Sequence, residues 1–284
     1  MRHFLLLLLL LPWAASAEPL RVFVSVLPIQ TLTQMIGGEQ VDVRSLVGRG
    51  YSPATYDPTP QQVAALAQAD LYLRIGVPFE NAWMARIKAA NPAMPLVDLR
   101  EGLHLRELEA HDHGHHDEHA HDSFDPHLWT SPRESRLIAQ NILQALLQLA
   151  PQQRALFESR HAQLDQQLQA LDDELSRLLT PLHGRSFLVF HPAWGYFAER
   201  YHLRQIAIEF EGKQAGARQL AELIEQAQHL QVRAIFVQPQ FDRRQAQRIA
   251  QAIKAQLIDA DPLSPDYFAN LRQVARDIAE TLQP

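Results

Sequence analysis

The chain has 284 residues, no cysteine, 14 histidines and a formal net charge of −6 at pH 7. The absence of cysteine excludes a disulfide framework, a thiolate metal site and a lipid anchor linked through cysteine. The acidic balance argues against nucleic acid and anionic membrane surfaces as partners, and it mildly favours cationic ligands.

The first residues have the pattern of a secretory signal peptide. Arg2 and His3 precede an apolar run over residues 4–11, and Ala15-Ser16-Ala17 follows as a cleavage site. The apolar run is too short to remain in a bilayer as a spanning helix. We therefore expect residues 1–17 to be removed, and the mature chain to reside in the bacterial periplasm without inserting into a membrane.

Residues 18–150 read as an α/β lobe in which apolar strands alternate with helices. Thr59-Pro60-Gln61-Gln62 and Ser131-Pro132-Arg133-Glu134 each have the pattern of a capping box at a helix start. The expected strands are residues 21–27, 41–47, 71–75 and 96–99, and the expected helices are residues 29–36, 59–69, 81–90 and 131–149.

The longest regular apolar repeat in the chain lies within residues 151–182. Its members fall at heptad-like spacing, with His161 in one apolar slot: Phe157, Leu164, Leu168, Leu171, Leu175 and Leu178. This spacing predicts one helix of about 28 residues, twice the usual globular length. Because α/β patterns stand on both sides, we expect it to link two lobes beside a ligand-binding cleft. The short heptad run without an isoleucine-rich seam favours a monomer.

Residues 183–284 repeat the alternation and form the second lobe. The expected strands are residues 187–190, 205–210, 234–237 and 256–258, and the expected helices are residues 219–229, 243–254 and 266–282. The predicted fold class is therefore α/β, with two lobes of parallel β-sheets flanked by helices and joined by one long linking helix. In such sheets ligands gather where strands end and helices begin.

Residues 111–121 hold six histidines and almost no apolar side chain. We expect a mobile loop that collects or senses metal, because neutral imidazoles suit Zn²⁺ and similar ions. These auxiliary metal ligands are His111, His113, His115, His116, His119 and His121.

Three further residues are candidate ligands of a primary metal site. His127 precedes a capped helix, His191 follows a strand, and Asp261 lies just beyond the last expected strand. Either histidine alone is more often a packed, hydrogen-bonded residue. Two imidazoles and one carboxylate together form a normal set of Zn²⁺ ligands. Because the carboxylate also suits Mn²⁺ and Fe²⁺, the ligand set does not decide which metal binds.

Several blocks in order give the chain its resemblance to a known family. They are residues 56–60 (YDPTP), the His-rich segment, residues 125–129 (DPHLW) with Ser131-Pro132, residues 190–197 (FHPAWGYF), residues 208–213 (IEFEGK) and residues 261–264 (DPLS). The chain resembles the cluster A-I substrate-binding proteins of bacterial zinc and manganese ABC importers. That resemblance implies one divalent ion held between two lobes and delivered to a permease in the inner membrane, with His127, His191 and Asp261 as ligands.

One position departs from the family pattern. Members usually carry a histidine two residues before the tyrosine of the YDPTP block, and here that residue is Ala54. A methyl group cannot coordinate metal, so water, a loop histidine or another neighbour has to fill the position.

Two other functions are compatible with an incomplete set of ligands. Three protein ligands and an open water position also describe a zinc-dependent hydrolase, for which Glu209 or Glu211 would be the base. The same fold would also suit a periplasmic metal buffer or chaperone. We expect a transport protein and not an enzyme, since no nucleophile elbow, HExxH helix, phosphate loop or dinucleotide fingerprint is present.

Overall fold

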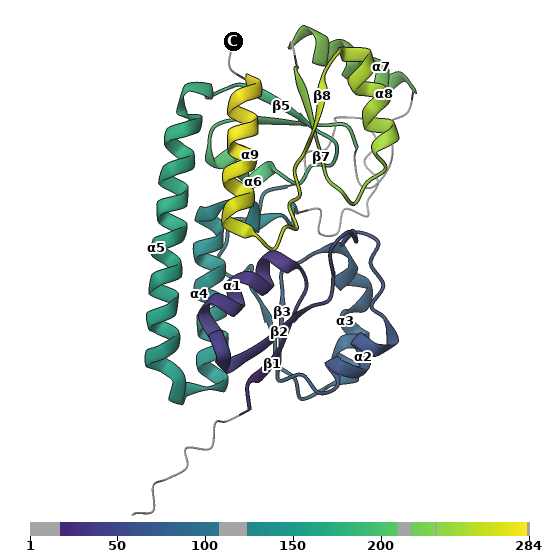
Figure 1. The fold of residues 1–284 in the computed structure, drawn as a ribbon. Helices are drawn as coiled ribbons and strands as arrows, with labels where there is room; N and C mark the ends of the chain where they lie inside the picture. Colours follow the sequence, from purple (N-terminus) through teal and green to yellow (C-terminus); the bar gives the residue numbers. More distant parts are fainter. Residues whose placement is uncertain (1–17, 108–123, 210–216, 231, 283–284) are drawn as a thin grey trace, which may run out of the picture.

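The computed structural model describes residues 18–107, 124–209, 217–230 and 232–282. The predicted signal peptide and the His-rich segment at 111–121 lie outside the described residues. Figure 1 shows two lobes, each built around a sheet, with one long helix running beside both of them.

The N-terminal lobe contains a four-stranded sheet in the order β2-β1-β3-β4, and all its strand pairs are parallel. Its elements are β1 (Leu20–Val24), α1 (Leu27–Gly37), β2 (Val41–Ser45), α2 (Pro60–Leu66), β3 (Leu71–Arg74), α3 (Pro78–Ala90) and β4 (Leu96–Asp98).

The C-terminal lobe repeats this arrangement with the order β6-β5-β7-β8, again all parallel. Its elements are β5 (Ser186–Val189), α6 (Gly195–Arg200), β6 (Arg204–Ala207), α7 (Ala217–His229), β7 (Ala234–Val237), α8 (Arg243–Ile253), β8 (Gln256–Asp259) and α9 (Tyr267–Leu282). The predicted α/β fold class is confirmed.

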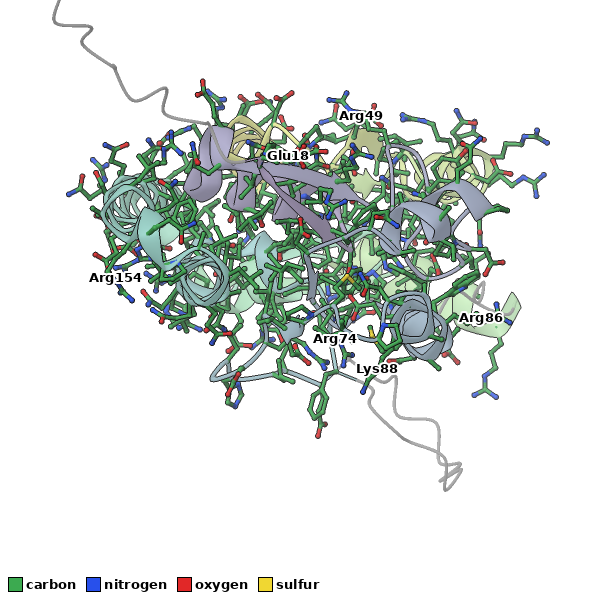
Figure 2. The ribbon with its side chains drawn as sticks, turned by 90° about the horizontal axis from the view of Figure 1, so that it is seen from below. Glu18, Arg49, Arg74, Arg86, Lys88 and Arg154 are labelled. Carbon is green, nitrogen blue, oxygen red and sulfur yellow. The ribbon has the colours of Figure 1, made fainter. Side chains whose placement is uncertain are left out.

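Helices cover both faces of each sheet. Viewed from below, Arg154 at the start of α5 (Arg154–Leu179) and Arg86 on α3 lie on opposite sides of the N-terminal sheet (Figure 2). In the second lobe, Phe187 and Val189 of β5 belong to one buried cluster, and Leu188 belongs to another. Successive strand residues point to opposite faces, so a strand with helices on both sides is apolar throughout. None of the described helices is both long and apolar enough to cross a membrane.

The long helix is present as α5, with 3₁₀ turns at Pro151–Gln153 and Thr180–Leu182. It has 26 residues, which corresponds to about 39 Å at 1.5 Å per residue. Its apolar stripe is buried, apart from Leu178, which is partly buried. The helix packs against α1 and α4 (Pro132–Leu149) and, in the other lobe, against α9. The predicted link between the lobes is therefore formed by one shared core.

Several predicted element ends differ from the structure by a few residues; the expected strand 205–210, for example, is β6 (Arg204–Ala207). The first strand ends at Val24, and Pro28 lies in the first turn of α1, where its missing N–H costs nothing. The capping box at Thr59 and Gln62 is confirmed. Ser131 precedes α4 as predicted, but among the described residues its hydroxyl makes no hydrogen bond, and Glu134 binds Arg133 instead of closing the capping box.

A largely buried ion pair joins α5 to the C-terminal lobe. Asp172 is only 3% exposed, and it accepts hydrogen bonds from the Arg200 guanidinium (2.6 and 2.9 Å) and from the Tyr201 hydroxyl (3.0 Å). Since a buried carboxylate depends on such partners, Asp172 orients α6 against the linking helix.

We predict that Asp172→Ala lowers the free energy of unfolding by about 1 to 3 kcal/mol, because it leaves the buried Tyr201 hydroxyl and the partly buried Arg200 guanidinium without their acceptor. Urea denaturation followed by circular dichroism measures this loss. Asp173→Ala is the control, since Asp173 is exposed on the same helix and should change stability by less than about 0.5 kcal/mol. Equal losses in the two variants would contradict the role of Asp172.

Candidate metal centre

His191 lies at the carboxyl end of the C-terminal sheet. It follows β5. In the strand order β6-β5-β7-β8, the connection after β5 runs to one side of the sheet and the connection after β7 runs to the other. The backbone of His191 is held by Gln238 just after β7. The His191 N–H donates to Gln238 Oε1 (3.2 Å), and Gln238 Nε2 donates to the His191 carbonyl (2.8 Å). The strand order thus places His191 where open parallel sheets bind ligands.

His127 lies in the N-terminal lobe just before a 3₁₀ turn at Leu128–Thr130. Asp125, 1% exposed, accepts from the His127 backbone N–H (3.0 Å) and pairs with the ring Nδ1 (2.8 Å). Its second oxygen accepts from Arg106 (3.0 Å). A carboxylate at Nδ1 favours the tautomer in which Nε2 carries the free lone pair, as in metal-binding histidines.

Burial by itself would raise the pKa of Asp125. The hydrogen bonds from His127 and the positive charge of Arg106 outweigh burial, so the pKa of this carboxyl lies below its ordinary value. Burial also lowers the pKa of His191, against the opposing charge of Glu209. Near pH 7 the Asp125 carboxylate is therefore ionised, and the His191 imidazole is neutral with a lone pair available for a cation.

The two histidine rings meet between the lobes. Their centroids are 5.4 Å apart and their planes are inclined at 76°. Two imidazoles that share a tetrahedral zinc ion have centroids about 5 Å apart, given the usual Zn–N distance. The rings line one pocket, whose walls also include Ser52, Pro53, Gln238, Gln240, Phe241, Pro262 and Leu263.

Asp261 is next to this pocket, but its carboxylate is engaged elsewhere. Its Oδ1 accepts from Gln240 Nε2 (2.8 Å) and from the Leu263 N–H (3.0 Å). Within the described ranges no three His, Asp or Glu side chains are grouped closely enough to hold a metal. The structure thus brings together two of the three predicted ligands, while the role of Asp261 stays a prediction.

The loop that carries Ala54 adjoins the same pocket. Ser52 and Pro53 line it, and the exposed Ala54 donates its N–H to the Ser52 hydroxyl (3.3 Å). Position 54 therefore follows directly after a residue of the pocket wall.

The predicted auxiliary ligands at 111–121 lie outside the described residues, but the residues that bracket the segment are described. Glu107 and Phe124 pair in an antiparallel bridge, and the Asp125 N–H donates to the Arg106 carbonyl (2.9 Å). The described residues on both sides of the segment therefore lie beside the carboxylate that holds His127.

The sequence analysis gave no role to Asp125, which orients His127, and it missed two side chains beside His191. Gln238 was not predicted, although it follows a clear strand, as ligand-binding residues do in parallel sheets. Glu209 was considered only as the base of a hydrolase. It is 4% exposed, and its Oε2 lies 3.6 Å from His191 Nδ1.

The indole of Trp129 connects the two lobes next to the pocket. Its Nε1 donates to the Pro262 carbonyl (2.7 Å), and the ring meets His127 edge to face. The N-terminal lobe therefore holds the segment that carries Asp261.

Comparisons with known proteins agree with this geometry. A family model described as zinc-uptake complex component A, periplasmic, matches residues 22–281. A solved structure described as a crystal structure of ZnuA is 37% identical with a TM-score of 0.87, and the match covers 94% of this chain and 100% of that one.

Two more distant relatives extend the comparison. The zinc-binding lipoprotein AdcA of Streptococcus pneumoniae serotype 4 is 28% identical over 258 residues, which are 87% of this chain and 50% of AdcA. This chain thus spans about half the length of that relative. The periplasmic zinc-binding protein TroA of Treponema pallidum is 20% identical with a TM-score of 0.82, covering 94% of this chain and 100% of that one, and supports the fold alone.

Two parallel α/β lobes with an imidazole from each at their junction define a two-lobed binding protein. The chain belongs to the family of the periplasmic component A of zinc-uptake complexes. The resemblance inferred from the sequence blocks is confirmed. The family description names a component of an uptake complex, which agrees with the expectation of a transport protein and not an enzyme.

We predict that Trp129→Phe lowers the free energy of unfolding by about 1 to 3 kcal/mol, because a buried carbonyl between the lobes loses its donor. Urea denaturation followed by circular dichroism provides the measurement. Trp83→Phe is the matched control: its indole donates to Asp57 within one lobe and is partly exposed, so water replaces the bond. A larger loss in the control would contradict the proposed contact between the lobes.

Proposed function

We propose that this protein is a periplasmic solute-binding protein that captures a divalent transition metal, Zn²⁺ first of all, between its lobes and delivers it to an ABC importer. The single observation that supports this most is the meeting of His127 and His191 from different lobes. Ligands from both lobes couple metal binding to the relative position of the lobes, which a permease can recognise.

Zinc is the favoured ion for two reasons. Neutral imidazoles are good ligands for Zn²⁺, and the ZnuA and AdcA relatives carry zinc in their descriptions. Mn²⁺ and Fe²⁺ remain alternatives if Asp261 joins the site, because a carboxylate suits them better than a third imidazole does.

In this proposal His127 and His191 are the primary ligands and Asp261 contributes the carboxylate. Asp261 would have to turn from Gln240 toward the pocket, and a small movement of the lobes could accompany that change. Histidines of the 111–121 segment would supply the position vacated at Ala54, because the described residues on both sides of that segment lie beside Asp125.

The cellular setting follows from the same proposal. A signal peptide over residues 1–17 is cleaved on export, the mature protein acts as a monomer in the periplasm, and the permease of the importer in the inner membrane is its partner. Release of zinc to that permease distinguishes an importer component from a metal buffer.

We predict that His127→Ala and His191→Ala each weaken zinc binding by more than about 100-fold, since the loss of a direct ligand exceeds the 10–100-fold cost of losing an outer partner. Competition titration against a chromophoric chelator measures the tight site. His229→Ala is the control, because this histidine is exposed on α7 and should leave the affinity unchanged. Wild-type affinity in both site variants would refute the proposed centre.

Ala54, which stands where the family usually has a histidine, gives a second prediction. Ala54→His should tighten zinc binding by about 10-fold, on the scale of one well-placed metal partner. Replacing the six loop histidines by serine should weaken binding in the wild-type background and have little effect in the Ala54→His background, where the position is already filled. Isothermal titration of the four proteins gives the comparison, and equal loop effects in both backgrounds would contradict the loop's part in the site.

A further inference from the structure

The two site histidines have buried carboxylates behind them, but the two pairs are not equivalent. Asp125 lies 2.8 Å from the Nδ1 of His127. Glu209 Oε2 lies 3.6 Å from the Nδ1 of His191, which is too far for a hydrogen bond. In the part of the chain that the structure describes, both carboxylate oxygens of Glu209 and the Nδ1 of His191 are buried without a hydrogen-bond partner.

Such a pair of buried polar groups requires an explanation, because an unpaired buried charge is costly and native proteins rarely retain one. Glu209 is also held in place. Its backbone N–H donates to the Phe190 carbonyl (2.9 Å), and the preceding Ile208 N–H donates to Val189 (3.0 Å). The main chain of Glu209 is therefore fixed beside the residue that precedes His191.

The imidazole of His191 has little freedom to turn away from this carboxylate. Phe241 stacks on one face, with centroids 4.9 Å apart and planes inclined at 25°. Gln238 holds the backbone at both its N–H and its carbonyl. His191 lines the pocket and Glu209 does not, so Glu209 faces the edge of the ring that carries Nδ1.

We propose that Glu209 is the positioning residue of His191: it accepts the Nδ1–H and directs the Nε2 lone pair toward the ion in the pocket. This inference rests on the proposed function. A bound cation polarises the imidazole and strengthens its N–H as a donor, so the 3.6 Å separation shortens to a hydrogen bond when the site is loaded. Each lobe then contributes one imidazole supported by one buried carboxylate.

Glu209 has opposite effects in the metal-free and the zinc-loaded protein under this proposal. Without metal, Glu209 is a buried carboxylate with no donor among the described residues, and replacing its charge by the amide of glutamine removes a desolvation cost. With metal, the same carboxylate supports a ligand. A merely structural glutamate would instead stabilise the protein in both states.

The test uses the full chain, ZnCl₂ as the probe and the variant Glu209→Gln. Its zinc affinity, measured by chelator competition, should fall 10- to 100-fold, as expected for loss of an outer-shell partner. The melting temperature of the metal-free variant should equal or exceed that of the wild type, while its rise on adding zinc should be smaller. Asp125→Asn should weaken binding to a similar extent, and Glu222→Gln, an exposed glutamate of the same lobe, should have no effect.

Nitrogen-15 NMR of the imidazoles gives an independent readout. In the zinc-loaded wild type, His191 should carry its proton on Nδ1 and bind through Nε2. Coordination through Nδ1, which would make Glu209 a neighbouring ligand, would overturn the proposal. So would wild-type zinc affinity in Glu209→Gln. A wild-type protein that binds no zinc would overturn the proposed function together with this inference, whereas the other two results overturn the inference alone.

Discussion

The burial of one face of α5 is the constraint on which the rest of the structure depends. The leucine stripe of this helix packs against α1 and α4 on one side and against α9 on the other, so one buried apolar cluster extends into both lobes. Separating the lobes widely would expose that stripe to water, at a cost proportional to the apolar area. We therefore expect motions that open the pocket to be small and to keep this core intact.

Ionic contacts add a second connection beside the pocket. Arg106 donates to Asp125 of its own lobe and, through Nε, to Glu199 of α6 in the other lobe (3.2 Å). Its backbone N–H also donates to the Tyr196 hydroxyl (3.1 Å). The carboxylate that orients His127 is thus linked through Arg106 to the C-terminal lobe. A shift of α6 would therefore displace Arg106 and, with it, the Asp125 carboxylate. The chemistry of the site and the position of the lobes are physically coupled.

The candidate site could be predicted in part. His127 and His191 stand in local patterns that are visible in the chain, one before a helix and one after a strand, and the structure places their rings together. Asp261 has the same kind of position after β8, yet its carboxylate is bound by Gln240. Glu209 and Gln238 had no local signal that linked them to His191. They follow β6 and β7, and these strands lie beside β5 only in the folded sheet.

The sequence by itself determined the alternation of strands and helices, the length of the linking helix and the family to which the chain belongs. These properties follow from local periodicity and from short blocks of residues, which depend only on the order of the amino acids. Only the tertiary structure decided which carboxylate lies behind which imidazole, that Trp129 reaches Pro262, and that the carboxylate of Asp172 is buried with Arg200. Those contacts join residues far apart in the chain, and they exist only after sheet order and packing have fixed the distances between them.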